Sequence, residues 1–208
     1  MIHKSLLLLI VVFLTSNSSF SQTFMIGTQV WSSKNLDVVT FRNGDTIAEI
    51  KSAEEWNECW KSGKPAWCYY ENDSNNGLKY GKLYNWFAVN DSRGLAPEGW
   101  HIPNDNEWDT LIKNLGGEDI AGKKMKKDET ISDSEDSFLG LPGGFRQYDG
   151  GFYWIDVFGY WWSSSGSQNG LKSSLFILYF IDKEDLDDKI QTKDLGKDFG
   201  LSVRCIKD

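Results

Sequence analysis

Few side chains in this sequence are placed to carry acid–base or nucleophilic chemistry. After residue 21 the only histidine is His101, which lies in an extended run between Trp100 and Ile102. Alternation along such a run places His101 opposite two apolar neighbours, where a histidine usually packs or forms a hydrogen bond. No nucleophile–base arrangement surrounds it, and the chain has neither a nucleophile elbow nor a phosphate-binding loop. We therefore predict no catalytic residue and no enzymatic activity.

The carboxylates and thiols do not define a hydrolytic or metal site. The thirty acidic residues leave a secreted hydrolase open as an alternative, but no pair of them stands out. Cys59, Cys68 and Cys205 lack the spacing of zinc ligands. Their odd number leaves at least one unpaired: Cys59 can pair with Cys68, or Cys205 with either. The oxygen-rich run 71–76 is interpreted as a solvated turn, with a calcium loop as the alternative. We predict no metal and no other cofactor.

A ligand-binding surface is predicted instead in the last third of the chain. The glycines at 143–144 and 150–151 let the backbone turn sharply there. Aromatic faces beside planar polar groups suit contacts with a glycan or a protein. As an alternative, strand alternation places Trp154 on the same side as Phe152 and directs it into the core. The predicted ligand-binding residues are Arg146, Tyr148, Tyr153, Trp154 and Asn169.

The N-terminus has the three-part pattern of a secretory signal peptide. Lys4 precedes nine apolar residues at 6–14, and small residues then stand at the positions that a signal peptidase reads before Gln22. Nine apolar residues fall far short of the roughly 20 that span a bilayer, so this segment is not predicted to be a membrane anchor. We predict residues 1–21 as the signal peptide and an exported protein that is secreted, periplasmic or associated with the cell surface. No membrane insertion is expected after cleavage.

The composition of residues 22–208 predicts one acidic, aromatic-rich domain. Cleavage leaves 187 residues and removes one lysine and no acid, so the net charge of −8 becomes −9. An acidic chain without a basic stripe repels phosphate backbones, which excludes nucleic acid as a partner. Most of the ten tryptophans are predicted to form the core of a loop-rich fold.

Two capping boxes and their apolar stripes predict the main helices. Ser52 with Glu55 begins one helix, and Asn104 with Glu107 begins another, which ends at the glycines 116–117. A short third helix is predicted near 83–87. The predicted buried faces of the two main helices are Ala53, Trp56 and Trp60 in the first and Trp108, Leu111, Ile112 and Leu115 in the second.

Short apolar or alternating runs predict the strands. The run 71–77 is predicted as a polar loop, and the charged segment 182–198 as an exposed loop or hairpin. Helices gather in the first two-thirds of the chain and antiparallel strands in the last third, which indicates an α+β fold. The predicted strands lie at 38–41, 46–50, 66–70, 145–148, 152–155, 161–162, 175–180 and 201–206.

Six motifs, taken together, carry a resemblance that covers nearly all of residues 22–208. They are Ile-Gly-Thr-Gln-Val-Trp at 26–31, Tyr-Gly-Lys-Leu-Tyr-Asn-Trp at 80–86, Pro-Glu-Gly-Trp-His-Ile-Pro at 97–103, Leu-Pro-Gly-Gly-Phe-Arg at 141–146, Gly-Tyr-Trp-Trp-Ser-Ser at 159–164 and Ser-Val-Arg-Cys at 202–205. In order and spacing they resemble the Fibrobacter succinogenes major paralogous domain family, an exported bacterial family of undefined function. More distantly, the run 102–108 is similar to a phrase in formylglycine-generating enzymes.

The resemblance implies a C-type-lectin-like domain with a twisted antiparallel sheet, two or three helices and long ordered loops. Many family members have a cysteine where this chain has Ala96, which leaves the partner of Cys205 open. Only Cys205 lies in the last third, so the two-cysteine activity of formylglycine-generating enzymes is not implied, and the calcium motifs of sugar-binding lectins are absent. The expected function is an exported, non-catalytic module for an extracellular glycan or protein. A structural cell-surface component without a ligand is the alternative.

Overall fold

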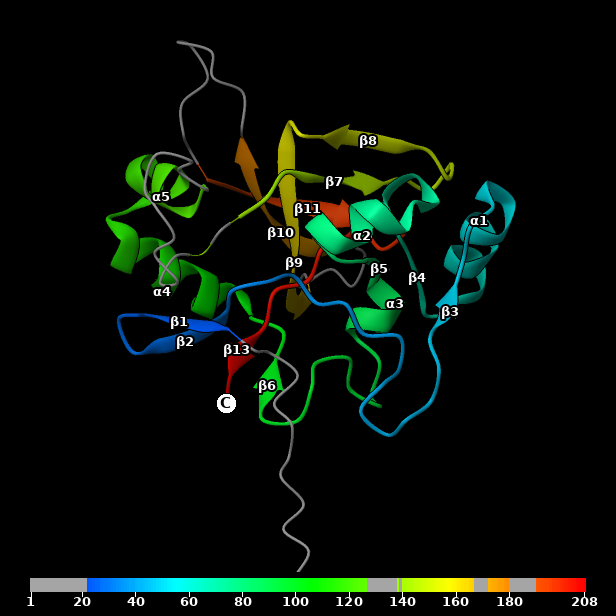
Figure 1. Cartoon of the computed structure of the whole chain (residues 1–208), viewed down its shortest axis with the longest axis horizontal. Helices are drawn as coiled ribbons and strands as arrows, with labels where there is room; N and C mark the ends of the chain where they lie inside the picture. Colours follow the sequence, from blue (N-terminus) through cyan, green and yellow to red (C-terminus); the bar gives the residue numbers. More distant parts are fainter. Residues whose placement is uncertain (1–21, 127–137, 139, 167–171, 180–189) are drawn as a thin grey trace, which may run out of the picture.

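Most elements of the structure are short strands, and the longer helices lie on opposite sides of the molecule (Figure 1). The computed structural model describes residues 22–126, 138, 140–166, 172–179 and 190–208. The strands are β1 (Thr23–Ile26), β2 (Gln29–Ser32), β3 (Ala48–Glu49), β4 (Ala66–Cys68), β5 (Leu83–Asn85), β6 (Trp100–His101), β7 (Gly143–Arg146), β8 (Phe152–Ile155), β9 (Phe158–Gly166), β10 (Lys172–Tyr179), β11 (Gln191–Gly196), β12 (Gly200–Leu201) and β13 (Ile206–Lys207). The helices are α1 (Ala53–Ser62), the 3₁₀ turn η1 (Tyr70–Asn72), α2 (Ser74–Tyr80), α3 (Trp86–Val89), α4 (Asp105–Leu115) and α5 (Glu118–Met125).

The strands form three sheets. Their orders are β1-β2-β13-β6, β11-β10-β9 and β3-β4-β5-β12-β7-β8. Within the described part of the chain, every strand pair is antiparallel except β3 with β4. An isolated bridge between Trp161 and Ser202 ties β9 to the segment after β12. The α+β class predicted from the sequence is confirmed.

The two capping boxes predicted the starts of α1 and α4 correctly. The Asn104 side chain accepts from the Glu107 backbone N–H, and Glu107 in turn accepts from the backbone N–H of Asn104. This reciprocal pair satisfies two N–H groups that have no partner inside the helix. The whole predicted stripe of α4 is buried, with Trp108 and Leu111 at 0% exposure.

Two local predictions are wrong, and a third holds in part. Trp60 is 43% exposed, because Cys59 rather than Trp60 takes the second buried position of α1 beside Trp56. The run 71–77 contains most of η1 and the start of α2, where the Asp73 side chain accepts from Asn75 and caps the helix. The runs predicted as strands at 38–41 and 46–50 meet in a single antiparallel bridge, Thr40 with Thr46, and only Ala48–Glu49 forms a strand, β3, which pairs with β4.

In the last third of the chain, the observed strands also differ in detail from the predicted ones. The strand predicted at 201–206 is divided into β12 and β13, which belong to different sheets, while the residues between them stay buried. The charged segment 182–198, predicted as an exposed loop or hairpin, contains β11 at 191–196, which pairs antiparallel with the central strand β10. Residues 182–189 lie outside the described part of the chain.

Aromatic side chains fill the interior, as the composition predicts. Eight of the ten tryptophans are at most 5% exposed, and the two exceptions are Trp60 and Trp154. Trp31 packs on Trp108 with ring centroids 4.8 Å apart, and Phe138 contacts both rings. The three cysteines are buried and free, so none of the three pairings that the sequence left open is present. No helix in the described ranges combines the length and apolar character needed to cross a bilayer.

Candidate ligand-binding surface

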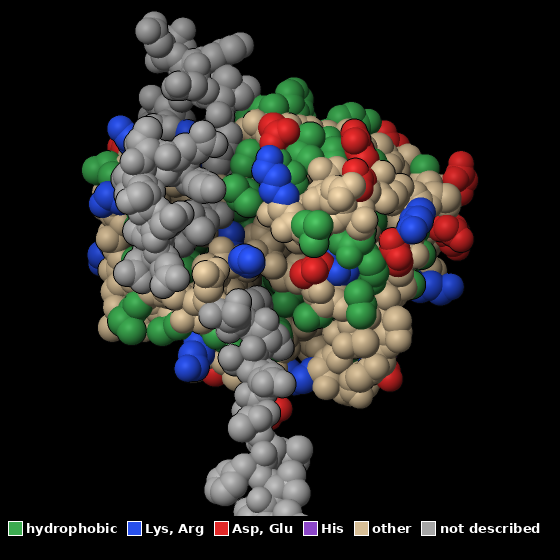
Figure 2. Space-filling model, in the orientation of Figure 1, with side chains coloured by type: hydrophobic (Ala, Val, Ile, Leu, Met, Phe, Trp, Pro, Cys, Tyr) green, Lys and Arg blue, Asp and Glu red, His purple; other side chains and the backbone are tan. Residues whose placement is uncertain are grey.

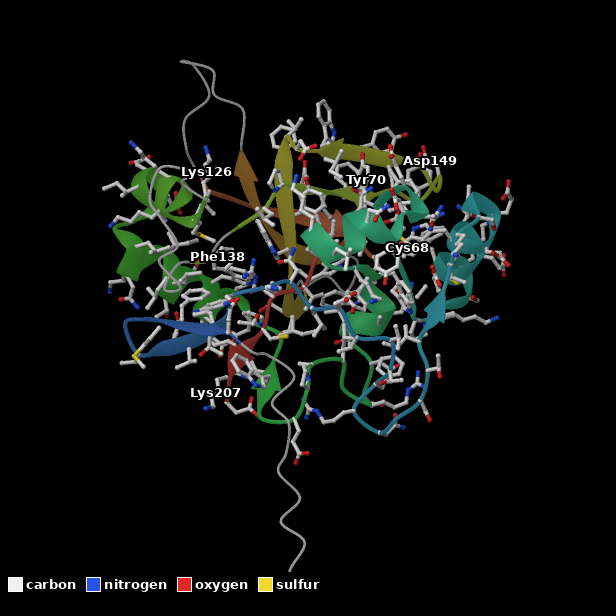
Figure 3. The ribbon with its side chains drawn as sticks, in the orientation of Figure 1. Cys68, Tyr70, Lys126, Phe138, Asp149 and Lys207 are labelled. Atoms are coloured by element: carbon white, nitrogen blue, oxygen red, sulfur yellow. The ribbon has the colours of Figure 1, made fainter. Side chains whose placement is uncertain are left out.

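The β7–β8 hairpin carries four of the five predicted binding residues, and its turn rests on the start of α1. Asp149 accepts from the Gly151 backbone N–H at 2.8 Å, and the Gln147 N–H donates to the Gly151 carbonyl. Gly150 has a φ of +82°, and a Cβ there would lie 2.3 Å from the Cβ of Ala53. Only glycine therefore lets the turn approach the helix so closely. Figure 3 labels Asp149 at this turn, close to the start of α1.

Trp154 does not follow the alternation of a regular strand. Its φ is +68°, a value that is rare for a bulky residue and costs about 1–3 kcal/mol. In the register of the hairpin it faces Gly144, whose φ is +62° and whose Cβ would lie 2.4 Å from the Tyr153 carbonyl oxygen. The interruption leaves Tyr153 and Trp154 both on the surface, at 38% and 51% exposure. The alternative that Trp154 points into the core is therefore wrong.

Ring contacts join these two exposed side chains into one array. Trp154 contacts Phe158 edge-on at 5.3 Å, and Phe158 contacts Tyr160 at 6.0 Å. Tyr160 contacts Phe145 at 5.0 Å, and Phe145 contacts Tyr153 at 5.6 Å. Phe145 and Tyr160 are buried, so a rigid interior supports both exposed ends. Figure 2 shows hydrophobic side chains gathered over the end of β8 and the start of β9.

The tyrosines add polar groups to this surface. The Tyr153 hydroxyl donates to Asp149 at 3.1 Å. This hydrogen bond, and the Asp149 and Tyr148 groups nearby, raise the pKa of Tyr153. Tyr148 is 47% exposed on the turn, and its carbonyl accepts from Asn57 of α1. We call Tyr148, Tyr153 and Trp154 the aromatic surface.

Arg146 lies beneath this hairpin rather than on it. Its side chain is 0% exposed, and it donates hydrogen bonds to backbone carbonyls of the 50–52 segment and of Gly150. The guanidinium also lies over the rings of Trp56 and Phe152, at 4.6 and 4.8 Å. Arg146 therefore holds the hairpin to the start of α1 and offers no donor to a ligand.

Of the five predicted binding residues, the structure brings three together on the surface. Asn169 lies outside the described residues, and Arg146 is buried. Sequence reasoning missed the supporting residues Phe145 and Phe158, and it missed Asp149 as a group that orients Tyr153. The Asp-Gly pair at 149–150 is recognisable in the sequence as a turn and points to Asp149. Contacts between rings on different strands leave no local pattern in the sequence.

His101 lies outside this surface, between two carboxylates. Its Nε2 lies 2.7 Å from Glu107 Oε1 and its Nδ1 lies 2.7 Å from Asp208 Oδ1. It is thus a hydrogen-bonding histidine, as the sequence predicts. In the described part of the chain, no group of three or more His, Cys, Asp or Glu side chains is arranged to hold a metal ion.

This setting gives His101 a pH-dependent effect on stability. Burial lowers the pKa of His101, but the hydrogen bonds to Glu107 and Asp208 outweigh it and raise the pKa above its ordinary value. The charged form therefore stabilises the fold fully below about pH 6.5, and this stability is lost as the pH rises through the folded-state pKa. We expect the charged imidazole to contribute less than about 1 kcal/mol to the free energy of unfolding, because its side chain is 38% exposed.

Urea unfolding of residues 22–208 and of the His101→Gln variant at pH 5.5 and pH 9 measures this effect. The difference between the two proteins should be larger at pH 5.5. As a control, Glu107→Gln keeps the helix cap but removes one carboxylate, and it should lower the His101 titration midpoint measured by NMR. A midpoint at or below about 6.5 in the parent protein contradicts the prediction.

Fold and site together describe an α+β protein with an exposed aromatic surface on a supported hairpin. A family model, the Fibrobacter succinogenes major domain, matches residues 24–207. The chain belongs to this family, as its six sequence motifs indicated. No curated protein and no solved structure gives a match.

Proposed function

We propose that the protein is an exported, non-catalytic module that binds an extracellular glycan through its aromatic surface. The observation that carries the proposal is Trp154, which stays half exposed at a left-handed φ in a protein that buries eight of its ten tryptophans. Burying such a ring contributes about 1.5–3 kcal/mol, and the backbone conformation costs about 1–3 kcal/mol more. A stability cost of this kind, at an exposed aromatic residue, is typical of a binding site.

Carbohydrate is the class of ligand that this surface suits best. Flat aromatic faces cover the apolar faces of sugar rings, and nearby acceptors bind their hydroxyl groups. Trp154 and Tyr153 supply the faces, and Asp149 supplies carboxylate oxygens beside them. The array beneath them is packed, so little side-chain freedom is lost on binding.

Export and the lectin-like architecture belong to the same proposal. The apolar run 6–14 and the small residues before Gln22 support cleavage of a signal peptide. The mixture of small antiparallel sheets, few helices and long loops is consistent with a C-type-lectin-like domain. A mature N-terminus near Gln22, measured by mass spectrometry on protein from the native host, tests export.

Two alternatives remain as competing functions. A structural surface component needs no exposed aromatic array, so the exposure of Trp154 favours the binding module. A hydrolase needs two carboxylates across a cleft. On the aromatic surface the Asp149 carboxylate already accepts from the Gly151 N–H and the Tyr153 hydroxyl, which favours a positioning role in binding over hydrolysis.

The test is a glycan array followed by calorimetric titration of the strongest hit. Trp154→Ala should weaken binding about 30-fold or more, the loss expected when an aromatic contact at the centre of an interface is removed. Tyr153→Ala should act in the same direction, and Tyr153→Phe should lose only the part due to the hydroxyl group.

Trp60→Ala is the matched control, because it removes an equally exposed tryptophan outside the aromatic array. Circular dichroism of each variant checks that the fold is unchanged. Binding that survives Trp154→Ala and Tyr153→Ala together, or the absence of any glycan hit, rejects the proposal and favours the structural role.

A further inference from the structure

A separate concave site lies between α1 and the β3 segment, at the edge of the molecule where Figure 1 shows the two side by side. The cavity has a volume of about 420 Å³. This lies within the range of about 300–1,000 Å³ that is typical of small-molecule sites. Its floor includes Phe41 and Ile47, both only 2% exposed, and the Cys59 side chain of α1. The interior surface is therefore mainly apolar.

The spacing of residues in α1 explains how charges come to line the same cavity. Glu55, Glu58 and Cys59 are separated by three and four positions, so they share one face of the helix. Cys59 lies between this charged face and the buried side of α1, where Trp56 packs against the Arg146 guanidinium. The buried side of α1 thus holds the helix to the hairpin, and the adjoining face presents two carboxylates and the edge of a thiol to the cavity.

The charges around the cavity favour a cation. Arg93 lines the rim, but Asp45 at 2.9 Å and Asp91 at 2.8 Å already neutralise it, and it lies over Phe41 at 4.0 Å. Among the described residues, neither Glu58 nor Lys64 forms an ion pair. Two carboxylates against one ammonium group leave the cavity with a negative field.

The environment of Cys59 places these charges close to the apolar floor. Burial raises the pKa of this thiol, Lys64 lowers it, Glu55 and Glu58 raise it further, and Arg146, which does not line the cavity, lowers it. The three charged groups that line the cavity therefore act on one point of its wall. A ligand that rests on the floor brings its own charge within reach of them.

We propose that this cavity binds a small molecule with an apolar body and a primary ammonium group. The apolar body rests on Phe41, Ile47 and Cys59, and the ammonium group lies beside Glu55 and Glu58. Apolar pockets with a few convergent polar groups are typical of such sites. This site is independent of the aromatic surface and of the glycan ligand proposed for it.

Calorimetric titration with two probes of matched shape tests the proposal. We expect 2-phenylethylammonium to bind with a Kd below about 1 mM, and 3-phenylpropionate to bind at least about fivefold more weakly. Glu58→Gln should weaken binding of the ammonium probe about fivefold. Glu54→Gln is the matched control, because it removes the same charge from α1 outside the cavity lining and should change nothing.

Two further variants locate the probe. Ala48 lines the cavity and is exposed, so Ala48→Phe fills the space without disturbing the core and should abolish binding. Trp154→Ala should leave binding of the ammonium probe unchanged. No binding of the ammonium probe at millimolar concentration, equal binding of both probes, or a loss caused by Trp154→Ala but not by Ala48→Phe overturns the proposal.

Discussion

Replacing Arg146 by Met should lower the free energy of unfolding by about 3–5 kcal/mol. The guanidinium is fully buried and donates to the carbonyls of Ile50, Lys51, Ser52 and Gly150. Methionine fills most of the volume but leaves these acceptors without donors, and each unsatisfied buried group costs about 1–3 kcal/mol. Because the hairpin turn and the start of α1 lose their connection, binding at the aromatic surface should weaken as well.

Urea unfolding of residues 22–208 measures this loss, and Arg42→Met provides the control. Arg42 also donates to backbone carbonyls, those of Ala96 and Trp100, but it lies on the surface. Water can replace its hydrogen bonds, so we expect a loss of about 1 kcal/mol or less. A similar small loss for Arg146→Met contradicts the structural role that we assign to this residue.

Replacing Leu111 by Ala should cost about 2–5 kcal/mol of unfolding free energy. Leu111 is 0% exposed and belongs to the buried cluster that contains Trp31, Trp108 and Phe138. Truncation removes buried apolar surface and leaves a cavity between rigid rings that cannot collapse easily.

Leu78→Ala is the same substitution on α2 at a position that is 87% exposed. We expect it to change the unfolding free energy by no more than about 0.5 kcal/mol. Thermal or urea unfolding of both variants makes the comparison. A loss of a few tenths of a kcal/mol for Leu111→Ala means that the apolar face of α4 does not form the core described above.

Sequence reasoning located exposed aromatic residues where the signal was compositional, and it misplaced residues whose position depends on contacts. Tyr148, Tyr153 and Trp154 were predicted because aromatic residues gather near the glycines at 150–151, and all three lie on the surface. Arg146 was predicted for the same region from its hydrogen-bonding capacity alone. Three of its four backbone acceptors lie almost a hundred positions earlier in the chain, and no local pattern reveals them.

The sequence by itself determined the features that depend on neighbours within one turn or one strand. The Asn104–Glu107 cap, the buried stripe of α4, the β7–β8 hairpin and the α+β class all follow from hydrogen bonds and periodicity over a few residues. Only the tertiary structure decided which side of β8 presents Trp154, because Gly144 on the facing strand shares its left-handed conformation. Packing between distant segments likewise buried Arg146 and divided the last predicted strand between two sheets, since burial and pairing depend on partners remote in the chain.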